Sequence, residues 1–414
     1  MITIENDLVL LRDLASRAIE AVEDPIHLKK EFGYLLQEGY PRELQLPYAY
    51  LALLAHLLQL GPIPLHPEQL PNGAAYLDAL GMTSGNQIPE PTQLAELGAL
   101  WMILGVCQKI EPLIYAGLKV AYWQSHMLDH AGLPHFSLWS LAPRYQASHL
   151  AAFNYLLFTL AYRITSGQGF LQAAQIQKLH GWDPTSLAGK LLSLIPDKLE
   201  ISVQLPFRPL TEEITLGMLK FTTPQWSMVC GLGGWNSGVF SYHKGSAALL
   251  NAGPQIEPLD ALEGFGVERG GGPFHEVLWE KTAHHFRLKG WTKIFALPTW
   301  MMMDAHFEAQ KLTLSCLLQE GKPHNRLFFV FYASCDHLSI PGKIPLQAGG
   351  LQGYQGKSLP IQIEAENQTI FIEPETECEM QIIPLAGGSH FLGAQFLIAY
   401  AFSNDNKFLQ FLIK

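Results

Sequence analysis

The sequence has few cationic residues for its length and no block of them. Lysine and arginine together number 27, against 37 aspartates and glutamates, which gives a formal net charge of -10 at pH 7. The cationic side chains are scattered singly along the chain. A protein that binds nucleic acid needs a basic surface to meet the phosphate backbone. We therefore expect no nucleic-acid partner.

Long apolar runs are also lacking. The longest, LPYAYLALLAHLL and LGALWMILGVC, stop at about a dozen residues, whereas a membrane-spanning helix needs about 18 or more. The first residues, MITIENDLVLLRD, are acidic and lack the basic region and the cleavage site of a secretory signal. We expect core helices, no membrane partner and a cytoplasmic location.

Cysteine is sparse, and several catalytic motifs are missing. The five cysteines include no CxxC pair, so the sequence predicts free thiols rather than a disulfide framework or a zinc ribbon. A GxSxG elbow and a Walker loop are absent as well. These absences argue against common hydrolases, kinases and dehydrogenases, and we expect no cofactor. The cysteines are Cys107, Cys230, Cys316, Cys335 and Cys378.

Hydrophobic periodicity divides the chain into two parts. Up to about residue 195 apolar residues recur at helical spacing, as in the stripe formed by Leu94, Leu97, Trp101 and Leu104. Beyond it the period is two, as in IQIEA at 361–365, and unbroken apolar runs such as RLFFVFYAS indicate buried strands. We predict an all-α domain over residues 1–197, followed by an antiparallel β-sandwich over 198–414.

The glycine-rich stretch CGLGGWNSGVFSYHKGSAALLNAGPQ, at 230–255, invites comparison with a phosphate-binding loop. Such a loop needs a following helix whose N-terminal amides face the phosphate. Here the sequence continues as strand, turn and strand. The stretch therefore predicts the turns of a sheet.

One helical segment carries a histidine pair. His126 and His130 in HMLDH are four residues apart, a spacing by which two imidazoles on one helix face can hold a zinc ion, with His135 or His149 as a further ligand. Histidines in a last helical turn also complement the helix dipole, which is the alternative reading. His284 and His285 are adjacent in a strand, point to opposite faces and cannot hold one ion together. No metal site is predicted.

Two loops gather aromatic and charged side chains, at residues 132–149 and 264–276. Aromatic rings stack on sugar faces, and arginine holds carboxylates with two hydrogen bonds. Because ligand sites favour domain interfaces, we expect the two loops to line one cleft between the domains. The alternatives are a packed connector and a solvated hairpin. The side chains are His135, Trp139, Arg144, Tyr145, Arg269 and His275.

The domain order resembles that of polysaccharide lyases of the heparinase II/III type, in which an α/α toroid precedes a β-sandwich. The stretches GVFSYHKGSAALLNAGPQ and PLAGGSHFLGAQFLIAYAF are similar in character to the sandwich strands of that class. With about eight helices, the resemblance implies an incomplete toroid-like helical domain. It also implies binding of an acidic glycan, with cleavage by β-elimination.

The resemblance further implies roles for particular residues. In those enzymes Tyr or His takes the proton next to a uronic carboxylate, while Asn, Arg or His neutralises that carboxylate. A noncatalytic scaffold that binds a glycan or a protein is the alternative. On this sequence the implied catalytic residues are Tyr145, His135 and Arg144, and the implied substrate-binding residues are Trp139, Asn236, Arg269 and His275.

Overall fold

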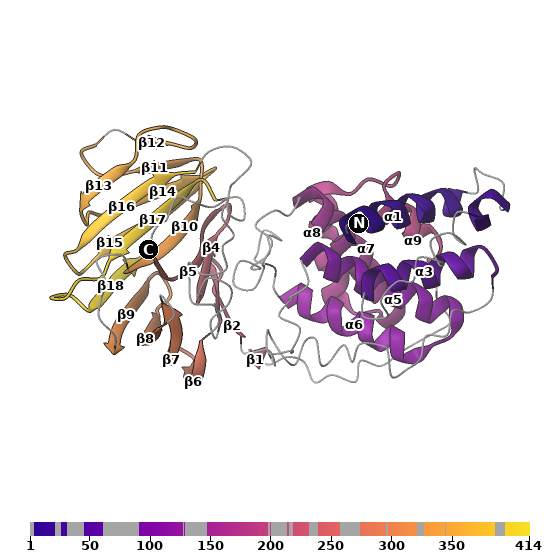
Figure 1. The fold of residues 1–414 in the computed structure, drawn as a ribbon, viewed down its shortest axis with the longest axis horizontal. Coiled ribbons are helices and arrows are strands. Elements are labelled where there is room, and N and C mark those ends of the chain that lie inside the picture. The colour runs from indigo at the N-terminus through magenta and orange to yellow at the C-terminus, as the bar shows by residue number, and fades with distance from the viewer. Residues whose placement is uncertain are drawn as a thin grey trace. The chain divides into compact units, whose positions relative to one another are not determined.

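The chain divides into two compact units, with the helices in one and the strands in the other (Figure 1). The predicted order, helices first and antiparallel strands second, is confirmed. A boundary at residue 197 stays a prediction, because residues 200–212 lie outside the described part. The computed structural model describes residues 4–20, 26–30, 45–60, 91–126, 128, 147–197, 199, 213–214, 218–231, 239–256, 274–294, 297–320, 327–343, 345–385 and 394–414.

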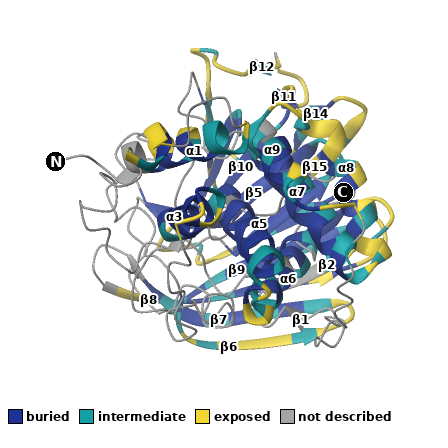
Figure 2. Cartoon of the chain, turned by 90° about the vertical axis from the view of Figure 1, so that its right-hand side faces the viewer, coloured by how far each residue is buried: buried dark blue, intermediate teal, exposed yellow. Residues whose placement is uncertain are grey.

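The helical unit is built around α5, whose side chains are buried from Leu94 to Gly105 (Figure 2). The predicted stripe is therefore part of a helix that is buried on all sides from Leu94 to Gly105, as expected of a central helix. Pro47 and Pro112 stand in the first turns of their helices, where a missing N–H costs no hydrogen bond. The helices are α1 (Ile4–Glu20), α3 (Gln45–Leu57), α5 (Pro91–Gln108), α6 (Glu111–His126), α7 (Ala147–Thr165), α8 (Gln168–Gly181) and α9 (Leu187–Ser193).

A buried ionic cluster joins three of these helices. Glu96 of α5 is fully buried and accepts hydrogen bonds from Nε of Arg12 in α1, at 2.8 Å, and from the hydroxyl of Tyr50 in α3. Burial, together with the charge of Glu96, raises the pKa of Tyr50 well above its ordinary value, so the hydroxyl remains a donor. The three groups satisfy one another in a place where an unpaired charge would be costly.

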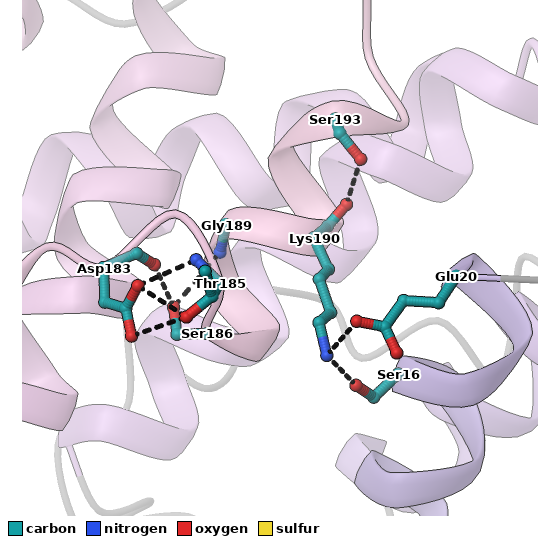
Figure 3. Close-up of polar contacts among 8 residues, drawn as sticks. All are labelled: Ser16, Glu20, Asp183, Thr185, Ser186, Gly189, Lys190 and Ser193. Carbon is teal, nitrogen blue, oxygen red and sulfur yellow. Dashed lines mark hydrogen bonds and ion pairs between the residues drawn. The ribbon is translucent and has the colours of Figure 1, made fainter. Parts of the chain in front are cut away.

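The short helix α9 is fixed by its cap and by one lysine (Figure 3). The hydroxyl of Ser186 accepts a hydrogen bond from the backbone N–H of Gly189 at 3.3 Å, as an N-cap does. Lys190 reaches α1, where its Nζ lies 2.6 Å from Oγ of Ser16 and 2.7 Å from Oε1 of Glu20. Lys190 therefore connects α9, the last described helix, to α1, the first.

Within the described residues, the strands form two nine-stranded sheets, in which the neighbouring strands pair antiparallel. In the first sheet, β5 and β17 are buried at every position, so both faces of the sheet are covered at these two strands, as the apolar runs predicted. Its order is β1 (Glu213–Ile214), β2 (Met218–Thr222), β3 (Ser227–Gly231), β4 (Phe240–Lys244), β5 (Ala247–Ile256), β10 (Leu327–Ser334), β17 (Phe396–Ala401), β16 (Glu379–Pro384) and β13 (Tyr354–Lys357).

The second sheet alternates buried and partly exposed positions, as β14 does in IQIEA. This pattern is that of a sheet with one face on a core. Its order is β12 (Leu346–Gln347), β11 (His337–Ser339), β14 (Ile361–Ala365), β15 (Gln368–Pro374), β18 (Phe408–Ile413), β9 (Leu312–Glu320), β8 (Leu297–Phe307), β7 (His285–Ile294) and β6 (His275–Thr282).

An aromatic cluster shows that the two sheets pack face to face. The ring of Phe411 in β18 lies with its centroid 5.5 Å from that of Phe329 and 5.3 Å from that of Phe331, both in β10. It lies 4.6 Å from the ring of Tyr400 in β17. Since β18 belongs to the second sheet and the other two strands to the first, the cluster bridges the layers of one core. The predicted β-sandwich is confirmed.

Two smaller predictions, on the glycine-rich stretch and on the cysteines, are also confirmed. The stretch from Phe240 to Ile256 forms strand, turn and strand, and Gly245 in the turn has a φ of +59°. All five cysteines are free thiols. Within the described residues, no helix combines the length and the apolarity that crossing a membrane requires.

Candidate functional site

The second sheet has an outer face, which is the face turned away from the sandwich core. On β7, Phe286 and Leu288 are buried in the core. Arg287, which lies between them, and Trp291, which follows them, are only partly buried. Alternate residues of a strand lie on opposite faces, so the second pair belongs to the outer face. Strand β6 is the edge of this sheet and is largely exposed (Figure 2).

Three ring-bearing side chains cross the outer face side by side, and we call them the aromatic row: His275, Trp291 and Trp300. The ring of His275 lies with its centroid 4.4 Å from that of Trp291. Trp291 and Trp300 are directly opposite each other in the pairing of β7 with β8. All three residues are partly exposed, so part of each side chain can contact a ligand.

A β-bulge in β6 sets this arrangement. His275 pairs with Trp291 and Leu278 with Lys289, so β6 holds one more residue than β7 between the two pairs. In a regular strand, residues three apart lie on opposite faces. Because of the extra residue, His275 and Leu278 both lie on the outer face. Gly290 permits the close approach, because a Cβ there would lie 3.0 Å from the backbone oxygen of His275.

Lys289 lies beside the aromatic row. It is two residues from Trp291 on the same face, roughly 7 Å along the strand. The residues directly opposite it are Leu278 on β6 and Met302 on β8. Among the described residues, neither of these directly opposite neighbours carries a charge that would pair with the ammonium group, and a cation stands next to the rings.

A second group lies further along the same face, and we call it the His–Asp cluster: His285, Asp304 and His306. One ligand atom from each residue lies within 4.8 Å of the others. Nε2 of His285 is 2.8 Å from Oδ1 of Asp304, and the rings of His285 and His306 stack with centroids 4.3 Å apart. His285 and Trp291 are six positions apart in β7, which corresponds to about 20 Å.

Arg287 holds the carboxylate of this cluster. Its Nε donates a hydrogen bond of 2.8 Å to Oδ1 of Asp304, whose side chain is only 8% exposed. That hydrogen bond and the charge of Asp304 raise the pKa of Arg287, so the guanidinium keeps its charge. Asp304 thus has two partners, His285 and Arg287, and their hydrogen bonds compensate for the burial of its charge.

Most of the residues predicted from the sequence lie outside the described part of the chain. These are Tyr145, His135, Arg144, Trp139, Asn236 and Arg269. The expected cleft between loops 132–149 and 264–276 depends on the same residues. His130 of the histidine pair is also outside, while His126 ends α6. Their predicted roles stay predictions.

Of the predicted site residues, His275 is described, and it belongs to the aromatic row. Sequence reasoning did not single out Trp291, Trp300, Asp304 or His306. His285 was considered only with its neighbour His284, whereas its partners lie on β8. A signal was present in WMMMDAHF, where Asp304 and His306 interrupt an apolar run at alternate positions and so share a face.

No protein-family model matches the sequence, and no curated protein does. Among solved structures, the chain is similar to a xanthan lyase of Paenibacillus, with 8% identity and a TM-score of 0.46 over 99% of this chain and 53% of that one. A chondroitinase AC lyase shows 10% identity and a TM-score of 0.41 over 99% and 75% of the two chains. A 4-alpha-glucanotransferase from Thermococcus litoralis shows 9% identity and a TM-score of 0.37 over 64% and 51%.

The chain thus spans about half the length of the glucanotransferase and of the xanthan lyase. The resemblance to lyases of the heparinase II/III type stays a prediction from the sequence.

Proposed function

We propose that this protein binds an acidic glycan and that the aromatic row on the outer face of the second sheet is a contact surface for it. The observation that carries the proposal is the placement of Trp291 and Trp300 directly opposite each other on neighbouring strands. Two indole side chains opposite each other on paired strands can form a platform held by the backbone pairing. Such a platform suits the flat apolar face of a sugar ring, which needs apolar contact without a deep pocket.

The acidic character of the glycan rests on Lys289. A sugar stacked on Trp291 would place its substituents along β7, where this ammonium group has apolar cross-strand neighbours. A carboxylate or sulfate on the sugar could pair there with the charge of Lys289. A neutral glycan would gain only the ring contact.

For the chemical step we propose β-elimination, which rests on the resemblance noted in the sequence. A base, Tyr145 or His135, takes the proton from the carbon next to the uronic carboxylate. The electron pair of that C–H bond forms a carbon–carbon double bond while the bond from the next carbon to the glycosidic oxygen breaks, and the oxygen leaves with a proton from the protonated base or from water. Arg144 or Asn236 neutralises the carboxylate, and Trp139 and Arg269 hold the sugar. Noncatalytic binding of the glycan is the second candidate, and the aromatic row favours it because rings alone bind sugar without cleaving it.

The test is to incubate the full chain with uronate-containing polysaccharides, with sulfated ones and with neutral glucans as the comparison. Binding is measured by affinity electrophoresis, and elimination by the ultraviolet absorbance of the unsaturated product. We expect retardation by acidic polymers, weaker retardation by neutral ones, and rising absorbance with at least one uronate polymer.

Each other outcome removes a specific part of the proposal. Retardation without absorbance contradicts the lyase reaction and leaves a binding protein. Equal retardation by acidic and neutral polymers contradicts the role of Lys289. Absence of retardation by any polymer contradicts glycan binding as a whole.

A further inference from the structure

We infer that the glycan site is an extended one, which takes an internal segment of a linear acidic polysaccharide and holds it across the strands of the second sheet. The inference rests on the proposed glycan binding and adds to it the direction and the length of the bound chain. It is carried by a row of side chains that lies beside the aromatic row, and by a polar row beyond it.

The side chains beside the aromatic row form a line across β6, β7, β8, β9 and β18, and we call this line the second row (Figure 1). Each member is directly opposite the next in the strand pairing, and the Cβ atoms of such pairs lie about 5 Å apart. Neighbours along the strands, such as Leu288, Met303 and Leu409, are in the sandwich core, so the line belongs to the outer face. At about 4.8 Å from strand to strand it is about 19 Å long. The second row consists of Leu278, Lys289, Met302, Leu317 and Phe408.

Apart from its lysine, the second row is apolar, and its two ends are exposed. Leu278 on the edge strand is 69% exposed, and Phe408 on β18 is 40% exposed. Met302 and Leu317 between them are partly exposed. Exposed apolar side chains that lie together mark a binding surface, whereas single ones on a protein surface are ordinary.

A polar row bounds this surface on the side away from the aromatic row. It crosses the same five strands, two residues further along each. Arg287 pairs with Asp304, and the carboxylate of Glu280, whose side chain is 71% exposed, adds a negative charge at the edge of the sheet. An acidic glycan that ran along the strands in this direction would lose apolar contact and meet that carboxylate. The polar row consists of Glu280, Arg287, Asp304, Ser315 and Gln410.

The aromatic row and the second row together form a strip that runs across the strands. The rings of the aromatic row contact sugar faces over β6, β7 and β8, and Met302, Leu317 and Phe408 continue the apolar contact to β18. Lys289 lies within the strip, where it can pair with an acidic group of one sugar unit. Because the side chains at both ends are exposed, a polymer can continue beyond the strip in either direction. The strip therefore suits an internal segment of a polysaccharide.

The test measures affinity against ligand length. Oligosaccharides from the disaccharide to the decasaccharide are prepared from an acidic polysaccharide that retards the full chain in affinity electrophoresis. Calorimetry then gives the affinity of the full chain for each length. We expect the affinity to rise at least about tenfold from the disaccharide to the hexasaccharide, because further units add apolar contact, and to level off once the strip is covered.

A variant at the far end of the strip separates the extended site from the aromatic row. F408A should bind the hexasaccharide about fivefold to tenfold more weakly and the disaccharide as the unmodified chain does, since a disaccharide reaches only the aromatic row. The matched control is F371A. Phe371 of β15 is 41% exposed on the same face, but it pairs with Lys414, which is six residues from Phe408 along β18, or about 20 Å. F371A should bind both ligands as the unmodified chain does.

The outcomes distinguish this inference from the proposed function. Affinity that does not change with length, or hexasaccharide binding that is equal in F408A and F371A, would overturn the extended site and leave glycan binding at the aromatic row. If no acidic polysaccharide retards the chain, glycan binding is contradicted, and the extended site with it. The length series uses the unmodified chain, so its result does not depend on how either variant folds.

Discussion

Replacing Glu96 by alanine is expected to lower the free energy of unfolding of the helical unit by about 3 kcal/mol. The substitution leaves the guanidinium of Arg12 without its counter-charge and the hydroxyl of Tyr50 without its acceptor, in the midst of three packed helices. Removing one partner of a buried ion pair costs about 3–5 kcal/mol, and the lower end applies because Arg12 keeps 24% of its side-chain exposure. Urea unfolding followed by helical circular dichroism measures the effect.

Two further variants make this prediction specific. E111A removes a carboxylate from the first turn of α6, where it accepts an exposed hydrogen bond from Tyr115, and should change stability by no more than about 0.5 kcal/mol. Replacing all three members of the cluster by apolar residues, as R12M, E96L and Y50F together, should restore most of the stability lost in E96A. If E96A and E111A unfold at the same urea concentration, the cluster does not hold the helices together.

Replacing Phe411 by alanine is expected to destabilise the strand unit by about 3–5 kcal/mol. Phe411 is 1% exposed and is the residue of β18 whose ring meets Phe329, Phe331 and Tyr400 across the sandwich. The change removes both the transfer free energy of the ring and the contacts between the layers, and it leaves a cavity between sheets that cannot close up fully. Denaturant unfolding followed by tyrosine and tryptophan fluorescence measures it.

Phe408 on the same strand is the control. Its ring lies on the outer face and is 40% exposed, so F408A should change the free energy of unfolding by no more than about 0.5 kcal/mol. A loss in F411A as small as that in F408A would contradict the packing of the two sheets through this cluster.

The fold follows from periodicity, which is a local property of the sequence. The alternation of Ile361, Gln362 and Ile363 predicts the burial of β14 position by position, because the period of two places alternate side chains on one face. The apolar run in β10 predicts a strand covered on both faces. Neither pattern depends on what the distant parts of the chain do, so both can be found without coordinates.

The candidate site depends on strand register, which local patterns do not contain. His285 meets His306 because β7 and β8 pair with these residues opposite each other, 21 positions apart in the chain. Likewise Trp291 and Trp300 become neighbours only through that pairing, and the bulge at His275 shifts one strand by a residue. From the sequence His275 could be proposed as a ligand-binding residue, but its contact with Trp291 could not.

The most direct test of glycan binding compares two tryptophans of adjacent strands. Trp291 lies in the aromatic row, whereas Trp279 of β6 is 41% exposed and opposes Leu288, which places it on the core side of the sheet edge. The ligand is an oligosaccharide prepared from an acidic polysaccharide that retards the full chain in affinity electrophoresis. Calorimetry measures the affinity of W291A and of W279A for it. Loss of a buried ring contact of roughly 1.5–3 kcal/mol predicts that W291A binds roughly tenfold to 100-fold more weakly, while W279A binds as the unmodified chain does. Equal affinities in the two variants, or a greater loss in W279A, would contradict a glycan site on the outer face of the second sheet.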